Sequence, residues 1–173
     1  MKKLITVCLC FWALVLNVSA KEKVDVYIFT KEDEPISASA IEYFKNLKAS
    51  NLGEMFDYHE IVIWDKDWHQ DEYNRNIADI VAASFEDEIL GAPYIVIGND
   101  YKLATYTENF NADIEKAITD AYDSDSYEDL IVKAKDEISH KKRNDLISFI
   151  VIVVATLSIS TLFVIMARKE EKA

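Results

Sequence analysis

The chain has 173 residues, half of them hydrophobic, and carries 31 acidic against 19 basic side chains for a net charge of −12. This length suits one domain with short appendages, and the apolar content excludes a disordered chain. The negative charge argues against a nucleic-acid-binding protein, which needs basic residues to neutralise phosphates. Both cysteines, Cys8 and Cys10, lie in the first ten residues, so the chain after residue 20 offers no disulfide or thiolate nucleophile.

The first twenty residues have the pattern of a secretory signal peptide. Two lysines, Lys2 and Lys3, precede an uncharged apolar stretch over residues 4–18, and small residues lead up to a cleavage point after Ala20. A lipoprotein signal cut before Cys10 is the alternative. It does not fit, because Leu9 stands where a small residue is needed and the cut would split the apolar stretch.

Residues 24–30 form a β-branched and aromatic run that predicts a central strand. Pro35 then opens a helix whose first turn follows three carboxylates, and a second strand is expected over residues 58–64. A second helix follows over about 72–85. After the break at 91–93, a strand over 94–97 and its return over 101–106 form a hairpin, and a third helix covers about 111–122. This β-α-β-α-β-β-α order predicts an α/β sandwich.

The sequence predicts that the α/β domain occupies residues 21–122 and that an acidic linker and a juxtamembrane helix follow over 123–145. The run from Ser126 to Asp129 resembles a capping box, so the helix should begin there and present Leu130 and Ile131 on its apolar face. We expect it to act as a stalk that continues into the next segment.

Residues 146–167 carry no charge over 22 positions, enough for the ~30 Å hydrocarbon core of a bilayer. Basic residues flank both ends, as expected of a single transmembrane helix rather than a buried helix of a soluble protein. The signal peptide then places residues 21–145 outside the cytoplasm and residues 168–173 in the cytosol. Five basic and two acidic residues lie outside 21–145, so that segment has a net charge of −15. This charge favours cationic partners or divalent ions; the alternative is that it only keeps the surface soluble.

Over about residues 24–122, the sequence resembles the thioredoxin/glutaredoxin superfamily. The resemblance rests on a first strand that ends before the motif Glu34-Pro35-Ile36-Ser37, on aromatic residues six and seven places after Ser37, and on a glycine and a proline before the hairpin. It implies a thioredoxin-like fold and a cis peptide bond before Pro93. It also implies that Ala92, Pro93 and Tyr94 form a peptide-binding groove beside the motif.

The motif departs from the family at both thiol positions, where Glu34 and Ser37 stand instead of cysteines. Disulfide exchange needs a thiolate at the helix N-terminus and a second thiol to resolve the mixed disulfide, so the sequence predicts a redox-inactive domain that is not an enzyme. Glu34 could act as an acid or base only with a partner such as His59 or His69, and the spacing places neither beside it.

Other groupings of reactive side chains are less specific. The carboxylate-rich run 65–72 lacks the alternation and glycine of a calcium loop and is interpreted as a solvated turn. Four aromatic residues could line a peptide groove, although core packing is the alternative for at least two of them: Trp64, Trp68, Tyr94 and Tyr101. No metal and no small-molecule cofactor is expected.

The leading hypothesis is therefore a single-pass membrane protein with a redox-inactive thioredoxin-like domain outside the cytoplasm that binds or scaffolds a protein or peptide. The alternative functions are an accessory subunit of a thiol-disulfide oxidoreductase, or another envelope enzyme using the Pro93 groove. A structural subunit assembled through its stalk and span is a third. The compartment is a bacterial cell surface or, alternatively, the endoplasmic reticulum; the absence of an Asn-x-Ser/Thr sequon after residue 20 favours the former.

Overall fold

The computed structural model describes residues 21–124 and 126–170, with side chains as far as residue 157. Its four strands form one mixed sheet in the order β2-β1-β3-β4. β1 (Val24–Lys31) pairs in parallel with β2 (Phe56–Trp64) and antiparallel with β3 (Tyr94–Ile97), and β3 pairs antiparallel with β4 (Tyr101–Leu103). The predicted α/β sandwich is confirmed at this level. The predicted signal peptide, 1–20, lies outside the described residues.

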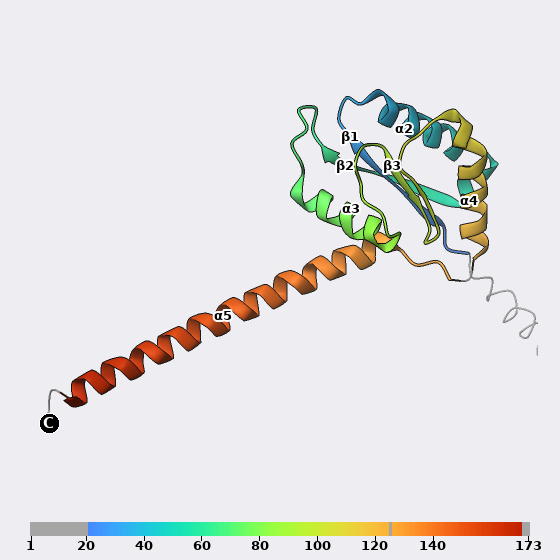
Figure 1. Ribbon diagram of the computed structural model, residues 1–173. Helices are drawn as coiled ribbons and strands as arrows, with labels where there is room; N and C mark the ends of the chain where they lie inside the picture. The colour runs from blue at the N-terminus through green and yellow to red at the C-terminus, as the bar shows by residue number, and fades with distance from the viewer. Residues whose placement is uncertain (1–20, 125, 171–173) are drawn as a thin grey trace, which may run out of the picture.

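Helices cover both faces of the sheet, as Figure 1 shows. One face carries α2 (Pro35–Lys48) and α4 (Asn111–Asp123), and the other carries α3 (Glu72–Ser84) and the first turns of α5 (Leu130–Glu170). The alternation of β1 explains this: Val26 and Ile28 face α2 and α4, whereas Tyr27 and Phe29 face α3 and α5. The sheet is therefore the middle of three layers.

The start of α5 is part of the packed domain rather than a free stalk. Leu130, Ile131 and Ala134 are buried against α3, and Ile138 packs on the same cluster. Each fully buried aliphatic side chain of this size contributes roughly 1.5–3 kcal/mol. The core therefore continues past residue 122, as far as the third turn of α5.

The helix also begins later than the sequence predicts. Residues 126–129 are not helical, and the cap is Asp129, whose Oδ1 accepts hydrogen bonds from the backbone N–H groups of Ile131 at 2.8 Å and Val132 at 3.2 Å. The expected start at Ser126 is wrong because Tyr127 is held by β1 instead: its hydroxyl donates to Asp25 Oδ2 at 3.2 Å.

The return strand of the hairpin is shorter than expected, ending at Leu103 instead of Tyr106. Tyr106 turns into the layer between α2 and α4, where it is buried, and its hydroxyl donates to Asn111 Oδ1 at 3.0 Å. Two short 3-10 helices, Asn51–Glu54 and Glu108–Phe110, complete the connections.

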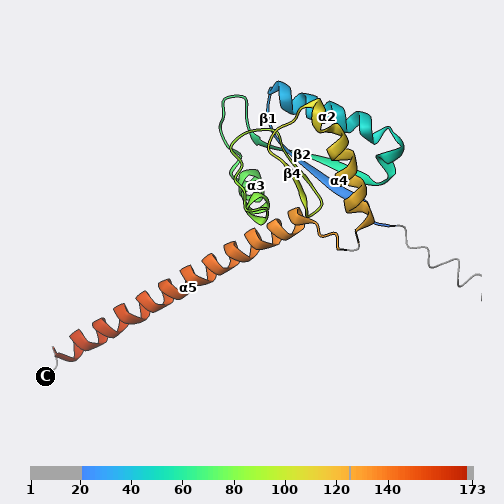
Figure 2. The same cartoon turned by 45° about the vertical axis from the view of Figure 1, so that its right-hand side comes forward.

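Beyond Lys142 the remainder of α5 projects away from the domain, as two views of the ribbon show (Figures 1 and 2). Its apolar side chains from Leu146 to Leu157 are exposed. Within the part of the chain that the structure describes, no helix meets the length and apolarity needed to cross a membrane. The side chains of 158–167, the second half of the predicted span, lie outside the described residues, so the span stays a prediction.

Candidate functional site

The motif from Glu34 to Ser37 lies where β1 passes into α2. Asp33 adopts a left-handed backbone conformation, with φ of 55°, and this reverses the chain after the strand. Glu34 is extended, and Pro35 occupies the first position of the helix, where its fixed φ suits the helix and its missing N–H costs nothing. The sequence therefore predicts this helix start correctly.

The Glu34 carboxylate closes the N-terminus of α2. Its Oε2 accepts a hydrogen bond from the backbone N–H of Ser37 at 2.5 Å. The N–H groups of a first helical turn have no partner within the helix, and the helix dipole favours a negative charge there. The first position of the motif is thus a capping carboxylate that is already bonded to the backbone of its own helix.

Ser37 is the one buried polar side chain among the described residues that lacks a hydrogen-bond partner. Its residue is 3% exposed, and Oγ makes no hydrogen bond. Most buried hydroxyls are satisfied, and an unsatisfied one costs about 1–3 kcal/mol. Sequence reasoning identified Ser37 as a site residue but gave no signal that its hydroxyl would be isolated.

Pro93 lies at the same end of the sheet as this motif. β3 is paired so that Tyr94 lies opposite Phe29, which places Pro93 next to Thr30 at the end of β1. The Ala92–Pro93 peptide bond is cis, as the resemblance implies. Pro93 is buried, and Ala92 is partly exposed.

Tyr94 does not line an open groove. It is 1% exposed and packs between the sheet and α3, with its hydroxyl donating to Asp87 Oδ2 at 3.2 Å. Burial and the Asp87 carboxylate both raise the pKa of Tyr94. The Lys102 ammonium in turn holds the pKa of Asp87 below its usual range through a hydrogen bond. Of the three residues predicted to form the groove, Tyr94 is thus a core residue.

A cavity of about 550 Å³ does lie beside the motif, between α2 and the connection from β4 to α4, and we call it the α2–α4 groove. Its lining comes from one face of α2 and from the chain entering α4: Pro35, Ile36, Ser39, Glu42, Tyr43, Asn46, Tyr106, Thr107, Glu108 and Asn111. The sequence does not predict most of this groove. It predicts Tyr106 to lie in the return strand, whereas Tyr106 leaves the sheet and forms part of the groove wall.

The aromatic wall of the α2–α4 groove is held in place by hydrogen bonds. The Tyr43 and Tyr106 rings lie with centroids 5.6 Å apart. Tyr43 donates its hydroxyl proton to the backbone carbonyl of Asn111 at 3.1 Å, and Tyr106 bonds the side chain of the same residue. Burial and the Glu115 carboxylate raise the pKa of Tyr43, and burial and the Glu108 carboxylate raise the pKa of Tyr106. Both hydroxyls are thus bonded to Asn111, and the rings form the wall of the groove.

Three large apolar side chains are exposed around the same end of the sheet: Ile36 at 42%, Trp68 at 58% and Leu90 at 84%. They come from the start of α2, the connection after β2 and the connection before β3, all of which meet at this edge because β1 and β2 are parallel. Of the three, Ile36 lines the α2–α4 groove. Of the four aromatic candidates, Trp64 and Tyr94 are buried, whereas Trp68 belongs to this edge.

The histidines are engaged away from Glu34. His59 Nε2 lies 2.7 Å from Asp25 Oδ1, and His69 Nδ1 lies 2.8 Å from Asp65 Oδ2. Asp65, Asp67 and His69, which belong to the carboxylate-rich run 65–72 that the sequence predicts to be a solvated turn, bring their ligand atoms within 4.8 Å of one another. Asp65 Oδ1 accepts from the backbone N–H groups of Asp67 and His69, so these contacts close a tight exposed turn.

No protein-family model, curated protein or solved structure matches this chain. Within the described residues, the start of α2 thus combines a carboxylate that caps its own helix, a buried hydroxyl without a hydrogen-bond partner and an adjoining groove with an aromatic wall.

Proposed function

We propose that this protein is a redox-inactive, thioredoxin-like binding module that holds a segment of a partner protein at the N-terminal end of α2. The observation that carries the proposal is the Glu34 carboxylate bonded to Ser37 N, beside the α2–α4 groove. A carboxylate cannot exchange disulfides, so a surface that retains the motif and the neighbouring groove is suited to binding without thiol chemistry.

Three features support the thioredoxin-like part of the proposal. The sheet order β2-β1-β3-β4 places the motif at the end of a central strand, helices cover both faces, and Pro93 precedes the strand that pairs beside the motif. The exposed side chains of Ile36, Trp68 and Leu90 extend the surface beyond the groove. A partner segment would bury these apolar groups, and its polar atoms would form hydrogen bonds with the serine, asparagine and threonine side chains of the groove.

The proposal includes anchoring of the domain to a membrane. It rests on the 22 uncharged residues over 146–167, their basic flanks and the signal-peptide pattern of residues 1–20. The domain would lie outside the cytoplasm, at a bacterial cell membrane or in the endoplasmic reticulum, with residues 168–173 in the cytosol.

Restoring the thiols tests the thioredoxin-like placement. In a Cys8→Ser/Cys10→Ser background, the full chain with Glu34→Cys/Ser37→Cys should form a reversible disulfide and catalyse insulin reduction by dithiothreitol. The matched control, Glu32→Cys/Ser39→Cys, places cysteines at exposed positions of the same segment and should not catalyse insulin reduction. Insulin reduction by the unmodified chain would refute redox inactivity. Failure of the restored pair to form a disulfide would refute the thioredoxin-like placement.

Photo-crosslinking tests the binding role. A benzophenone amino acid at Ile36 or Thr107, both on the α2–α4 groove, should capture one defined partner in membranes of the native host, and the same group at exposed Glu54 should not. Equal labelling at all three positions would contradict a specific surface. Capture of a cysteine-containing oxidoreductase would favour the accessory-subunit function over a general scaffold.

A further inference from the structure

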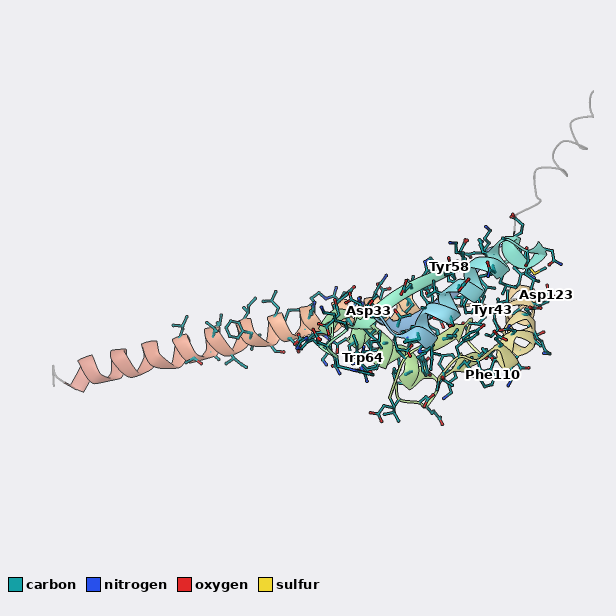
Figure 3. All side chains as sticks on the ribbon, turned by 90° about the horizontal axis from the view of Figure 1, so that it is seen from above. Asp33, Tyr43, Tyr58, Trp64, Phe110 and Asp123 are labelled. Atoms are coloured by element: carbon teal, nitrogen blue, oxygen red, sulfur yellow. The ribbon has the colours of Figure 1, made fainter. Side chains whose placement is uncertain are left out.

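We propose a second binding site, at the opposite end of the sheet from the motif, that receives a lysine or arginine side chain from a cationic segment of a partner protein. The site is a cavity of about 280 Å³ between the turn after β3, α4 and the chain entering α5. Figure 3 shows this end of the domain: Asp123 lies there, on the side away from Asp33 and Trp64. We call the cavity the Tyr127 pocket, after the residue that closes one wall.

The floor of the Tyr127 pocket is apolar. Ile97 of β3 and Ala117 and Ala121 of α4 line it, together with the rings of Tyr101 and Tyr127. The pocket lies just below the size range of cavities that take drug-sized ligands, so it suits a single long side chain. The methylene stem of lysine or arginine packs well on such a floor while the charged head reaches the rim.

The rim is acidic. Asp100, Asp113 and Asp120 line the mouth, and Lys116 is its one cation. Lys116 is already paired with Asp120, whereas among the described residues neither Asp100 nor Asp113 takes part in an ion pair. The Asp113 carboxylate, after burial, also raises the pKa of Tyr101. The charge of Asp113 also helps to raise the pKa of Lys116, after the larger effect of Asp120. Two carboxylates outside any close ion pair, above an apolar floor, are complementary to an amphipathic cation.

The walls are held in place before any ligand binds. Asn99 fixes the chain that enters α5: its Nδ2 donates to Ser126 O at 2.8 Å, and its Oδ1 accepts from Glu128 N at 3.1 Å. Gly98 allows the close packing behind, since a Cβ there would lie 3.0 Å from Ala121 Cβ. A pocket held in this way loses little conformational entropy when it binds a side chain.

The acidic surface continues beyond the pocket, which favours a segment of protein over an isolated cation. A shallower cavity of about 380 Å³ shares Tyr127 and is bordered by Glu22, Glu128 and Asp136. Lys133, which also lines this cavity, pairs with Glu128 at 3.3 Å. The net charge of −15 over residues 21–145 would attract a basic partner to the domain.

Titration with defined peptides tests the proposal. The probe is an acetylated, amidated hexapeptide alternating alanine and arginine, and its control replaces arginine with citrulline, which has the same shape without the charge. Binding to the full chain in detergent micelles is followed by calorimetry in about 0.1 M NaCl, where the Debye length is about 10 Å. We expect saturable binding of the arginine peptide alone.

Matched charge variants then locate the site. Asp100→Asn/Asp113→Asn should weaken binding of the arginine peptide at least about fivefold, since it removes charge-assisted hydrogen bonds. Glu54→Gln/Asp67→Asn changes the net charge equally, at exposed positions outside the pocket, and should change affinity less than about twofold. Equal loss in both variants, equal binding of the citrulline peptide, or complete displacement by millimolar calcium with no dependence on Asp113 would overturn the proposal.

Discussion

Replacing Ser37 with alanine should make this protein more stable. The Ser37 hydroxyl is buried in the first turn of α2 and has no hydrogen-bond partner among the described residues. In the unfolded chain the same hydroxyl is hydrated, so folding removes its bonds to water without replacing them. Ser37→Ala eliminates this loss and leaves the backbone bond from Ser37 N to Glu34 unchanged.

The expected gain is about 1–2 kcal/mol. An unsatisfied buried hydroxyl lowers the unfolding free energy by about 1–3 kcal/mol. Removing the oxygen also loses packing contacts worth a few tenths of a kcal/mol, which reduces the gain slightly. For a packed unit of this size, that gain corresponds to a rise of roughly 3–8 °C in the melting temperature. A Ser37→Cys variant should gain as well, because a thiol is a weaker hydrogen-bonding group than a hydroxyl.

Urea unfolding of the full chain in detergent, followed by tryptophan fluorescence, measures the change. Ser39→Ala is the matched control: Ser39 lies two residues further along the same helix, is exposed, and donates its hydroxyl to Pro35 O at 2.9 Å. We expect the control to change the unfolding free energy by less than about 0.5 kcal/mol. Destabilisation by Ser37→Ala would refute the reasoning, since it would mean that the hydroxyl is satisfied.

Three further changes should affect stability in predictable directions. Glu34→Ala removes the cap on Ser37 N and should cost about 1 kcal/mol in urea unfolding, with a smaller loss for Glu34→Gln, which can still accept the bond. Gly53→Ala should lower the unfolding free energy by more than about 2 kcal/mol in the same assay, because the added Cβ would lie 2.0 Å from Lys48 O. Gly91→Ala is the neutral control, since a Cβ at Gly91 would meet no atom within 4 Å. A hydrogen bond from Lys48 lowers the pKa of Asp57 in the folded protein. The ionised pair, which is half exposed, therefore stabilises the fold above about pH 4, and this stabilisation is lost as the pH falls through the lowered pKa of Asp57. Asp57→Asn should therefore be less stable than the parent at pH 7, by under about 1 kcal/mol, and the two unfolding curves should converge in acid; a constant difference would contradict the assignment.

Local patterns were enough to predict most elements. The run over 24–30 has the residues of a buried central strand, and Pro35 after three carboxylates marks a helix start that the structure confirms. These predictions succeed because strand and helix preferences depend on neighbours a few residues apart. The same local reasoning failed at Ser126, since the competing partner of Tyr127 is Asp25, 102 residues away.

The candidate site was predicted only in part. The positions of Glu34 and Ser37 at the start of α2, and of Pro93 at the same end of the sheet, agree with the motif, whereas Tyr94 is a core residue. The α2–α4 groove depends on Tyr106 turning away from the hairpin to bond Asn111, and no local pattern indicates that turn.

The order of the elements, the absence of cysteine after residue 20 and the acidic charge of residues 21–145 can all be read from the amino-acid sequence, because each depends on composition and short-range periodicity. Which polar groups find partners depends instead on how the layers pack. It isolated the Ser37 hydroxyl, bonded Tyr27 to Asp129 at 2.9 Å and docked the first turns of α5 onto α3. Hydrogen bonding and burial join residues distant in the chain, so the α2–α4 groove and the Tyr127 pocket could be located only once the layers had been packed together.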